Sequence, residues 1–537
     1  MSEQQKPKRS LVSIASIVAA ATLISKIFGL VRQQAIAAAF GVGPAVDAYT
    51  YAYVIPGFLL VLLGGINGPF HSAIVSALAK RKPVEAAPLV ETITTLVSCI
   101  LLPVTIALIF FAHPAIDLVA PGLTETPEGM EIRAIAIQQF RIMASLALLA
   151  GLIGLGFGTL TAADRYWLPS ISPLFSSVAL IAGLGILALH LGEKIIQPEY
   201  ALLGGVVLAW STLAGAILQW LMQLITQWRS GLGSLRPRFN FRQPGVTEVL
   251  KVMGPAIFSS GMMQINVWTD LFFASFIPQT AAGLAYAGLL VQTPLGILSN
   301  TILVPLLPML SRLADPNDWP ELKLRIRQGL IVTALTTLPL GAMTIVLAVP
   351  IVRVVYERGA FDRGASQFVA PMLMAYGLGL FVYLGRDVLV RVFYALGDGQ
   401  TPFRVSVINI ALNVLLDYLL INSFGAPGLV LATVGVNVIS MVAMLWLLHR
   451  KLHGLPLLKW SLPIASLIVG SILAGIASHA TAQHWEQFFG TEGLVTQILE
   501  LIISATVGLG VFFLFATQLK LPEVDMFMSR LRQKLHS

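Results

Sequence analysis

The chain has 537 residues, of which 56% are hydrophobic and only 11% are charged, and its formal net charge is +8. This composition excludes a soluble globular protein and a disordered one, and it is typical of proteins that cross a membrane several times. The single cysteine, Cys99, excludes a disulfide within the chain. A basic excess can indicate a nucleic-acid partner, but the distribution of these charges indicates orientation in a membrane, so we expect no nucleic acid.

Apolar stretches of membrane-spanning length recur along the whole chain. A spanning helix needs about 20 mostly apolar residues. By this criterion the sequence predicts an all-α polytopic membrane protein with fourteen transmembrane helices. Their expected ranges are 10–40, 45–69, 88–112, 133–158, 171–190, 200–226, 247–276, 282–310, 328–352, 366–395, 402–422, 427–449, 460–480 and 494–518.

The positive charges divide unequally between the two sides of these fourteen helices. With the N-terminus taken as cytoplasmic, 24 of the 34 Lys and Arg residues fall on the cytoplasmic side and five on the other side. Cytoplasmic loops of membrane proteins carry such an excess. The asymmetry therefore supports the helix count and places both termini in the cytoplasm. The remaining five basic residues lie within spans: Lys26, Arg32, Arg141, Arg386 and Arg391.

A faint internal repeat relates the two halves of the chain. Asp164 and Asp398 each end a predicted helix shortly before a proline, and their separation along the chain nearly equals that of Phe40 from Phe276. Coincidence is the alternative, because Asp and Pro are common at helix ends. A parallel repeat of six helices predicts two lobes around a central cavity, with a substrate site between them. The expected domains are an N-terminal lobe (1–240), a C-terminal lobe (241–455) and an appended helix pair with a cytoplasmic tail (456–537).

Two basic residues in the first span predict a cationic surface inside the bundle. A charge near the bilayer centre is costly, so Lys26 and Arg32 are expected to face a wet cavity, with Asp47 at its outer mouth. Cations in such a cavity suit anionic cargo such as phosphate. The alternative is that Arg32 extends to the membrane interface.

Oxygen-bearing side chains at similar estimated depth predict a cation site. Asp270 lies in the seventh predicted span, and Thr433 lies in the twelfth. Carboxylate, amide and hydroxyl oxygens are ligands that small hard cations take. Sodium and a proton are both candidates, and hydrogen bonding between helices is the alternative reading. The eleventh predicted span adds one polar stripe, formed by Ser406, Asn409, Asn413 and Asp417.

Three further features have less specific interpretations. The tenth span carries Asp387 four residues before Arg391, which is the spacing of a helical ion pair, whereas Arg386 is not expected to face Asp387. The stretch GGINGPF, 64–70, indicates either a helix that breaks, which suits a moving element, or close helix packing at its glycines. The stretch 319–329, WPELKLRIRQG, is either a helix on the membrane surface or a basic loop.

The sequence resembles the MurJ/MviN family, the lipid II flippases of the MOP exporter superfamily. The resemblance covers essentially the whole chain. It is carried by SKIFGLVRQQAIAAAFGVGPAVDAY, KVMGPAIFSSGMMQI and FYALGDGQTP. It implies fourteen helices, two lobes that alternate access to a cationic cavity for the pyrophosphate-linked headgroup, and a final helix pair that lines a groove for the polyprenyl tail.

The resemblance also implies roles for individual residues. Lys26, Arg32 and Asp47 match residues of the family's cargo cavity, and Asn67 stands where the family has an acid in helix two. Helix two here, PGFLLVLLGG, lacks the family's arginine, Gln33 replaces an acid, and Leu289 lies near the place of an arginine in helix eight. A sodium site is implied at Asp270, Asn413, Asp417 and Thr433, with the backbone carbonyl of Leu429.

Together these features predict a flippase rather than an enzyme. The sequence has no GxxxxGK[ST] loop and no loop grouping of acids or histidines suited to a membrane transferase. We expect translocation of lipid II from the cytoplasmic to the outer leaflet of the bacterial inner membrane, by a monomer coupled to a cation or to the membrane potential. Another polyprenyl-pyrophosphate-linked oligosaccharide is an alternative cargo, and a cation-coupled multidrug exporter is an alternative function.

Overall fold

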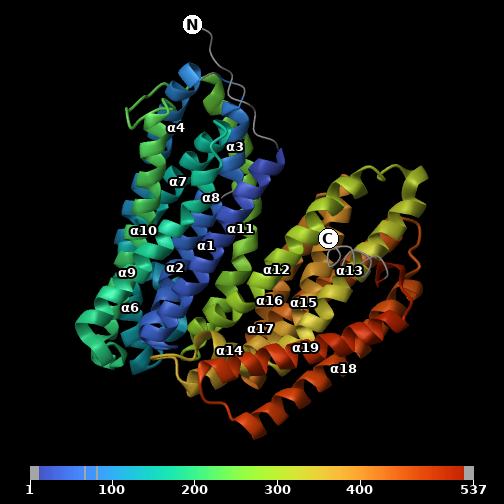
Figure 1. Ribbon diagram of the computed structural model, residues 1–537. Coiled ribbons are helices and arrows are strands. Elements are labelled where there is room, and N and C mark those ends of the chain that lie inside the picture. The colour runs from blue at the N-terminus through green and yellow to red at the C-terminus, as the bar shows by residue number, and fades with distance from the viewer. Residues whose placement is uncertain (1–10, 66–67, 80, 82, 525–537) are drawn as a thin grey trace. The chain divides into compact units, whose positions relative to one another are not determined.

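The computed structural model describes residues 11–65, 68–79, 81 and 83–524, and every regular element in these ranges is a helix (Figure 1). The predicted all-α architecture is therefore confirmed. The chain divides into two compact units, the first formed by Met1–Ala282 with Arg358–Ala360 and the second by Gly283–Glu357 with Phe361–Ser537. The three-part division at residues 240 and 455 was drawn from the repeat and stays a prediction.

The first unit contains α1 to α11. The bounds are α1 (Leu11–Phe40), α2 (Pro44–Gly64), α3 (Pro69–Leu78), α4 (Pro83–Phe110), α5 (Ala112–Val119), η1 (Pro121–Thr124), α6 (Pro127–Met143), α7 (Leu146–Ala162), α8 (Trp167–Ile171), α9 (Pro173–Leu191), η2 (Gly192–Ile196), η3 (Pro198–Tyr200), α10 (Ala201–Arg229) and α11 (Pro244–Ala274).

The second unit contains α12, apart from its first residues, and all later helices. The bounds are α12 (Thr280–Ser311), η4 (Pro316–Asp318), α13 (Trp319–Val346), α14 (Ala348–Tyr356), α15 (Arg363–Ala395), α16 (Gln400–Phe424), α17 (Ala426–Lys451), α18 (Leu457–Phe489) and α19 (Leu494–Gln518).

Each of the fourteen predicted spans overlaps a helix, although the span 133–158 crosses the break between α6 and α7 and the span 328–352 crosses the break between α13 and α14. Within the described residues, eleven helices are long and apolar enough to cross a membrane, or twelve if α6 and α7, which meet at 40°, form one bent span. The helices α1 and α11 lie at the two remaining predicted positions and have 30 and 31 residues. At 1.5 Å per residue, each is about 45 Å long, which exceeds a hydrocarbon core of about 30 Å. The count of fourteen is compatible with these lengths and stays a prediction.

Four short α-helices in the described ranges were not predicted. They are α3, α5, α8 and α14, of 10, 8, 5 and 9 residues. All are too short to span a bilayer, so a search for spans overlooks them. The break at GGINGPF is confirmed, because α2 ends at Gly64 and α3 begins at Pro69. The basic stretch from Trp319 is neither a separate surface helix nor a loop, because it forms the first turns of α13.

The core of the first unit is formed where α7 packs on its neighbours. Its buried apolar residues come from α2, α3, α4, α7 and the start of α11, and include Leu63, Phe70, Ile93 and Leu155. Close approach depends on small residues in α7. A Cβ atom at Gly154 would lie only 1.7 Å from the carbonyl oxygen of Leu63. Small residues at such contacts let helix backbones approach in membrane proteins.

The basic segment 230–243 is attached to α4 by one buried acid. The carboxylate of Glu91 accepts hydrogen bonds from the backbone N–H and the hydroxyl of Ser234 at 3.0 and 2.8 Å. The Nε of Arg238 donates to the same carboxylate at 2.6 Å, and its backbone N–H donates to Thr95. This connection is therefore held by specific charge-assisted bonds rather than by helix packing.

The helices α7 and α15, which correspond to each other in the predicted six-helix repeat, each end in a turn of the same type. The backbone N–H groups of Arg165 and Asp398 each donate to the carbonyl five residues earlier, both at 2.9 Å. The preceding residues have positive φ, 57° at Asp164 and 72° at Gly397. This combination is the Schellman C-cap. The two turns align Asp398 with Arg165, so the sequence pairing of Asp398 with Asp164 is wrong by one residue.

A second pair of helix ends has the same separation along the chain. Gly192 ends α9 with φ 55° and ψ −132°, and Gly425 ends α16 with φ 60° and ψ −139°. Residues with a side chain rarely adopt this conformation. The pairs Arg165 with Asp398 and Gly192 with Gly425 have the same separation along the chain, which supports the internal repeat. This separation also tells which residue of α9 corresponds to which residue of α16.

Candidate functional site

The predicted polar stripe lies on the buried face of α16. Asn409 is 4% exposed, and Asn413 and Asp417 are fully buried. The Nδ2 of Asn413 donates a hydrogen bond of 2.5 Å to Oδ2 of Asp417. Burial of an acid and an amide side by side is costly in free energy unless their polar atoms have partners. The stripe is therefore a specific feature that needs an explanation.

The repeat shows that the fold itself does not require polar residues at these positions. With Gly425 aligned on Gly192, Asn413 corresponds to Leu180 and Asp417 to Leu184 of α9, and both leucines are buried. The same helix in the same place of the repeat thus packs with leucine in the first half. Packing between helices alone does not account for the acid and the amide in the second half, which favours a functional role.

The helix α17 packs on α16 and carries two more of the predicted ligands. Leu429 is 1% exposed and Thr433 is half-buried. Carboxylate, amide, hydroxyl and carbonyl oxygens fit a sodium ion, because small hard cations prefer oxygen ligands. Asp270, the fifth predicted ligand, is half-buried on α11 in the first unit. The site as a whole stays a prediction, and its four other residues come from two packed helices.

Arg32 lies half-buried on α1 beside the aromatic residues of α2. Its Nε is buried and has no hydrogen-bond acceptor among the described residues. The guanidinium lies close enough to Tyr49 and Tyr53 for its charge to act on their hydroxyls. Those two rings stack at 5.5 Å, and the Tyr49 hydroxyl is 3.0 Å from that of Thr212. A buried N–H donor of Arg32 that has no acceptor in the described protein suits an anionic ligand, which would accept its hydrogen bond. Lys26, in contrast, is exposed.

Asp47 has a structural role that the sequence did not predict. Its side chain is 1% exposed, and its carboxylate accepts hydrogen bonds from the backbone N–H groups of Gln279 at 3.2 Å and Ala282 at 2.9 Å. These groups lie at the start of α12, where helix N–H groups lack partners within the helix. Asp47 therefore caps α12 from α2. Contact of Asp47 with cargo stays a prediction, and Asn67 lies outside the described residues.

One expectation for the tenth predicted span is wrong. Nη1 of Arg386 lies 3.9 Å from Oδ1 of Asp387, whereas we expected Arg386 not to face Asp387. Arg391 also lies close enough for its charge to act on Asp387, and a direct pair between these two stays a prediction. Arg386 also donates from Nε to the hydroxyl of Ser440 at 3.0 Å. Adjacent residues diverge by about 100° around a helix, but the long arginine side chain spans that angle.

Asp398 joins three elements at the end of the Schellman turn. It accepts hydrogen bonds from the backbone N–H and hydroxyl of Thr401, at 3.0 and 2.8 Å, and from Nζ of Lys451 at 2.8 Å. Burial alone would raise the pKa of Asp398, but the hydrogen bonds from Lys451 and Thr401 lower it to about 2. Asp398 therefore stabilises the start of α16 and its contact with the end of α17.

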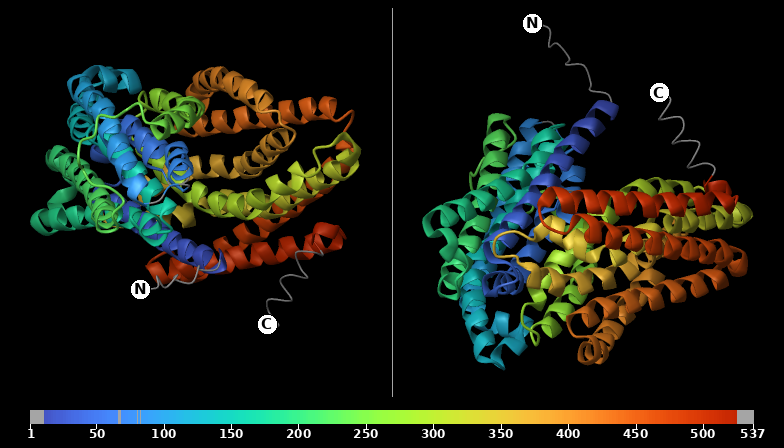
Figure 2. Two further views of the ribbon diagram at one scale, coloured as in Figure 1. Left: turned by 90° about the horizontal axis from the view of Figure 1, so that it is seen from above. Right: turned by 60° about the horizontal axis from the view of Figure 1, so that its bottom comes forward.

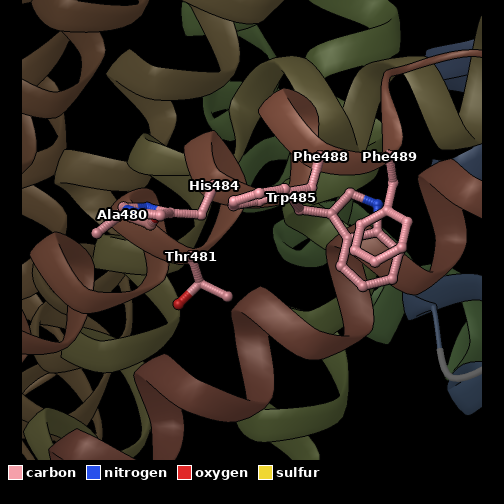
Figure 3. A pocket seen from close by; sticks show the side chains of 6 residues that line it. All are labelled: Ala480, Thr481, His484, Trp485, Phe488 and Phe489. Atoms are coloured by element: carbon pink, nitrogen blue, oxygen red, sulfur yellow. The ribbon is translucent and has the colours of Figure 1, made fainter.

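Aromatic residues gather on the last turns of α18 (Figure 3). They line a shallow hollow of about 360 Å³ together with Ala480, Thr481 and His484. Trp485 and Phe489 lie with ring centroids 4.4 Å apart, and Phe488 is 79% exposed. Exposed aromatic residues at a helix end are typical of the membrane–water interface. The hollow therefore indicates where this helix leaves the bilayer rather than a reaction site.

The fold and the buried polar residues define a class of protein. Long apolar helices, a repeat with matched helix ends, a half-buried cation and an acid–amide pair in an apolar helix are features of a multi-spanning membrane transporter.

Comparison with known proteins identifies the family. The family model for the lipid II flippase MurJ matches residues 36–499. A probable lipid II flippase MurJ from Synechocystis sp. is 58% identical over 534 residues, which cover 99% of each chain. The chain therefore belongs to the MurJ family of lipid II flippases, which are transporters and not enzymes, as the sequence predicted.

Two solved structures have the same fold. The inward closed conformation of lipid II flippase MurJ matches 94% of this chain and 98% of its own, with a TM-score of 0.75 and 22% identity. An inward-facing multidrug resistance MATE family transporter of the MOP superfamily matches 82% of this chain and 98% of its own, with a TM-score of 0.58 and 16% identity. At these identities the likeness shows the fold alone, and membership of the MOP superfamily stays a prediction from the sequence.

Proposed function

We propose that this chain is a lipid II flippase, which moves the lipid-linked peptidoglycan precursor from the cytoplasmic to the outer leaflet of the inner membrane. The observation that carries this proposal is the 58% identity, over essentially the whole length, to a probable lipid II flippase. Alternating access between the two leaflets is the mechanism that the MOP-type fold supports. The chain acts as a monomer with both termini in the cytoplasm, in line with the excess of basic residues on that side.

Arg32 is the residue that binds the pyrophosphate of the cargo. Its guanidinium has a buried donor without a protein acceptor, and it is fixed beside the aromatic residues of α2. Arginine binds phosphate oxygens through paired, charge-assisted hydrogen bonds, which gain strength where water is excluded. Lys26, two helical turns before Arg32, adds a mobile positive charge for the same anion.

Asn413 and Asp417 bind the coupling cation together with Leu429, Thr433 and Asp270. A bound sodium ion supplies positive charge that compensates the buried carboxylate of Asp417. This chain's contribution is to hold that carboxylate in place through the Asn413 amide, on a helix whose counterpart in the first half carries leucine. Coupling follows if only one conformation of the transporter gathers all five groups.

Complementation tests this function. The chain is expressed in a bacterium depleted of its own lipid II flippase, and growth and lipid II exposed on the outer leaflet are measured. We expect full rescue of growth by the intact chain and partial rescue by Arg32→Lys. We expect no rescue by Arg32→Ala, when this variant is present in the membrane in the same amount as the intact chain. Normal rescue by Arg32→Ala would refute its role in cargo binding.

One observation favours a second cargo. The described helix α2 contains no basic residue, and Leu289 occupies the place near which the family has an arginine in helix eight. Part of the expected contacts to the headgroup is therefore absent. An intact chain that inserts correctly and fails to rescue would indicate another polyprenyl-pyrophosphate-linked oligosaccharide, and drug resistance conferred by the chain would indicate an exporter.

A further inference from the structure

One acid in the C-terminal helix pair is buried without a hydrogen bond to its carboxyl group in the described structure. Glu500 is the single charged residue of α19, and its side chain is fully buried. Neither carboxyl oxygen has a hydrogen-bond partner among the described residues. Buried polar atoms in native proteins nearly always have partners, so an unpartnered carboxyl group needs a specific explanation.

Two serines share this buried environment. The helices α18 and α19 run side by side as an antiparallel pair in both views (Figures 1 and 2), and Gly508 packs against the carbonyl oxygen of Ala474. One turn nearer the connecting loop on each helix, this register places Ser504 opposite Ser478. Both serines are fully buried, and their hydroxyls have no partner among the described residues. Glu500 lies one further turn along, on the same face of α19.

The guanidinium of Arg353 lies close to Glu500 and forms long ion pairs with two other acids. Arg353 on α14, which packs against α19, has a side chain only 6% exposed. It lies 3.7 Å from Glu357 and 3.6 Å from Glu486 of α18, and its Nη1 makes no hydrogen bond in the described structure. Arg353 and Glu486 both lie close enough to Glu500 for their charges to act on it.

No other titratable group faces Glu500 within the described part of the unit. The helix α13 also packs on α19, but its residues 328–346 include none. His479 and His484 of α18 are exposed. The ion pair of Arg327 with Glu523, at 2.9 Å, lies beyond the other end of α19. The local charges are therefore three carboxyl groups and one guanidinium.

Burial decides which of the three carboxyl groups is neutral. The side chains of Glu486 and Glu357 are 41% and 21% exposed, so water stabilises their charges. Glu500 has neither water nor a hydrogen-bond donor, and an ionised carboxylate in that position is far less stable than the neutral acid. We propose that Glu500 is a proton-binding site between α18 and α19. It holds a proton in this conformation, and on releasing that proton to solvent it takes Arg353 as its partner, in competition with Glu357 and Glu486.

The first experiment detects the proton directly. Infrared difference spectra of the full-length protein in lipid are recorded between acidic and alkaline pH, in potassium and without sodium. We expect a band of a protonated carboxylic acid that is absent in Glu500→Gln, displaced in Glu500→Asp and unchanged in Glu492→Gln, which alters an exposed acid of the loop beside α19. A wild-type spectrum whose bands all persist in Glu500→Gln would overturn the proposal. If Glu500→Gln does not fold, the proposal is overturned by a Glu500→Asp spectrum in which the carboxylic acid band keeps its wild-type position.

The second experiment measures proton linkage. Burial favours the protonated form of Glu500 in the folded chain relative to the unfolded one, so folding takes up protons above the pH at which the unfolded chain ionises, and stability falls as pH rises there. The unfolding equilibrium constant then increases by up to tenfold per pH unit above about pH 4.3. The slope of the logarithm of this constant against pH gives the number of protons taken up on folding. We expect that number to be smaller by up to one in Glu500→Gln and unaltered in Glu492→Gln. Parallel pH profiles of wild type and Glu500→Gln would refute the site. Stabilisation by sodium at fixed pH that is lost in Glu500→Gln would also refute it, because the ligand would then be a metal ion.

Discussion

The cap that Asp47 forms on α12 leads to a quantitative prediction. In Asp47→Ala, two backbone N–H groups lose a charged acceptor at 3.2 and 2.9 Å, in a site that is 1% exposed. Buried donors left without partners cost about 1–3 kcal/mol each, or about 2–6 kcal/mol for the two, and relief of the carboxylate's own desolvation offsets part of this cost. The net loss expected is about 1–3 kcal/mol. Asp47→Asn keeps one acceptor oxygen and loses the charge at the helix N-terminus, which is worth about 1 kcal/mol.

Amide hydrogen exchange measures the loss of local stability at the start of α12 in Asp47→Ala. A decrease of about 1–3 kcal/mol in local opening free energy speeds exchange about 5–150-fold, because each 1.4 kcal/mol is a factor of ten. We expect this acceleration in a peptide covering 275–290 of Asp47→Ala, a smaller one in Asp47→Asn, and none in peptides of α18. Unchanged exchange at 275–290, with transport lost, would show that Asp47 acts on cargo instead of capping α12.

Three other substitutions follow from the contacts described above. Asp398→Ala is expected to cost about 1–2 kcal/mol through loss of a cap and an ion pair. Because the pKa of Asp398 is lowered to about 2, its stabilisation is complete above about pH 4 and is lost as pH falls towards 2, so mutant and wild-type melting curves should converge in acid. Glu91→Gln should release the segment 230–243 and speed its limited proteolysis; an unaltered cleavage rate would refute the attachment. Asn413→Leu/Asp417→Leu should fold at least as stably as wild type, because apolar replacements of buried ionic groups are neutral or stabilising, and it should lose any sodium-dependent rise in melting temperature. Retention of that rise would refute the cation site.

The positions of the long helices were predictable because bilayer thickness fixes their length. Every predicted range overlaps a helix, from α1 to α19. Short helices were missed for the same reason, since α3, α5, α8 and α14 lack the length that the criterion requires. The bend between α6 and α7 was missed too, because no proline marks the break at Ala144 and Ser145.

The candidate site was only partly predictable. Spacing on one helix placed Asn413 and Asp417 on a common face, and the structure confirms that face as buried. Spacing did not predict that Asp47 reaches the start of α12, because 232 residues separate it from Gln279. Glu500 was also overlooked, since a lone acid in an apolar helix becomes informative only when its lack of partners is known.

The matched turns after α9 and α16 have a consequence for biosynthesis. The first half of the repeat, which the ribosome completes first, carries leucine at the two positions where the second half has Asn413 and Asp417. At these two positions the first half therefore needs no counter-ion. The second half has to accommodate the buried acid Asp417 there, so we expect the salt supplied during synthesis to affect the yield of folded second half more than that of the first half.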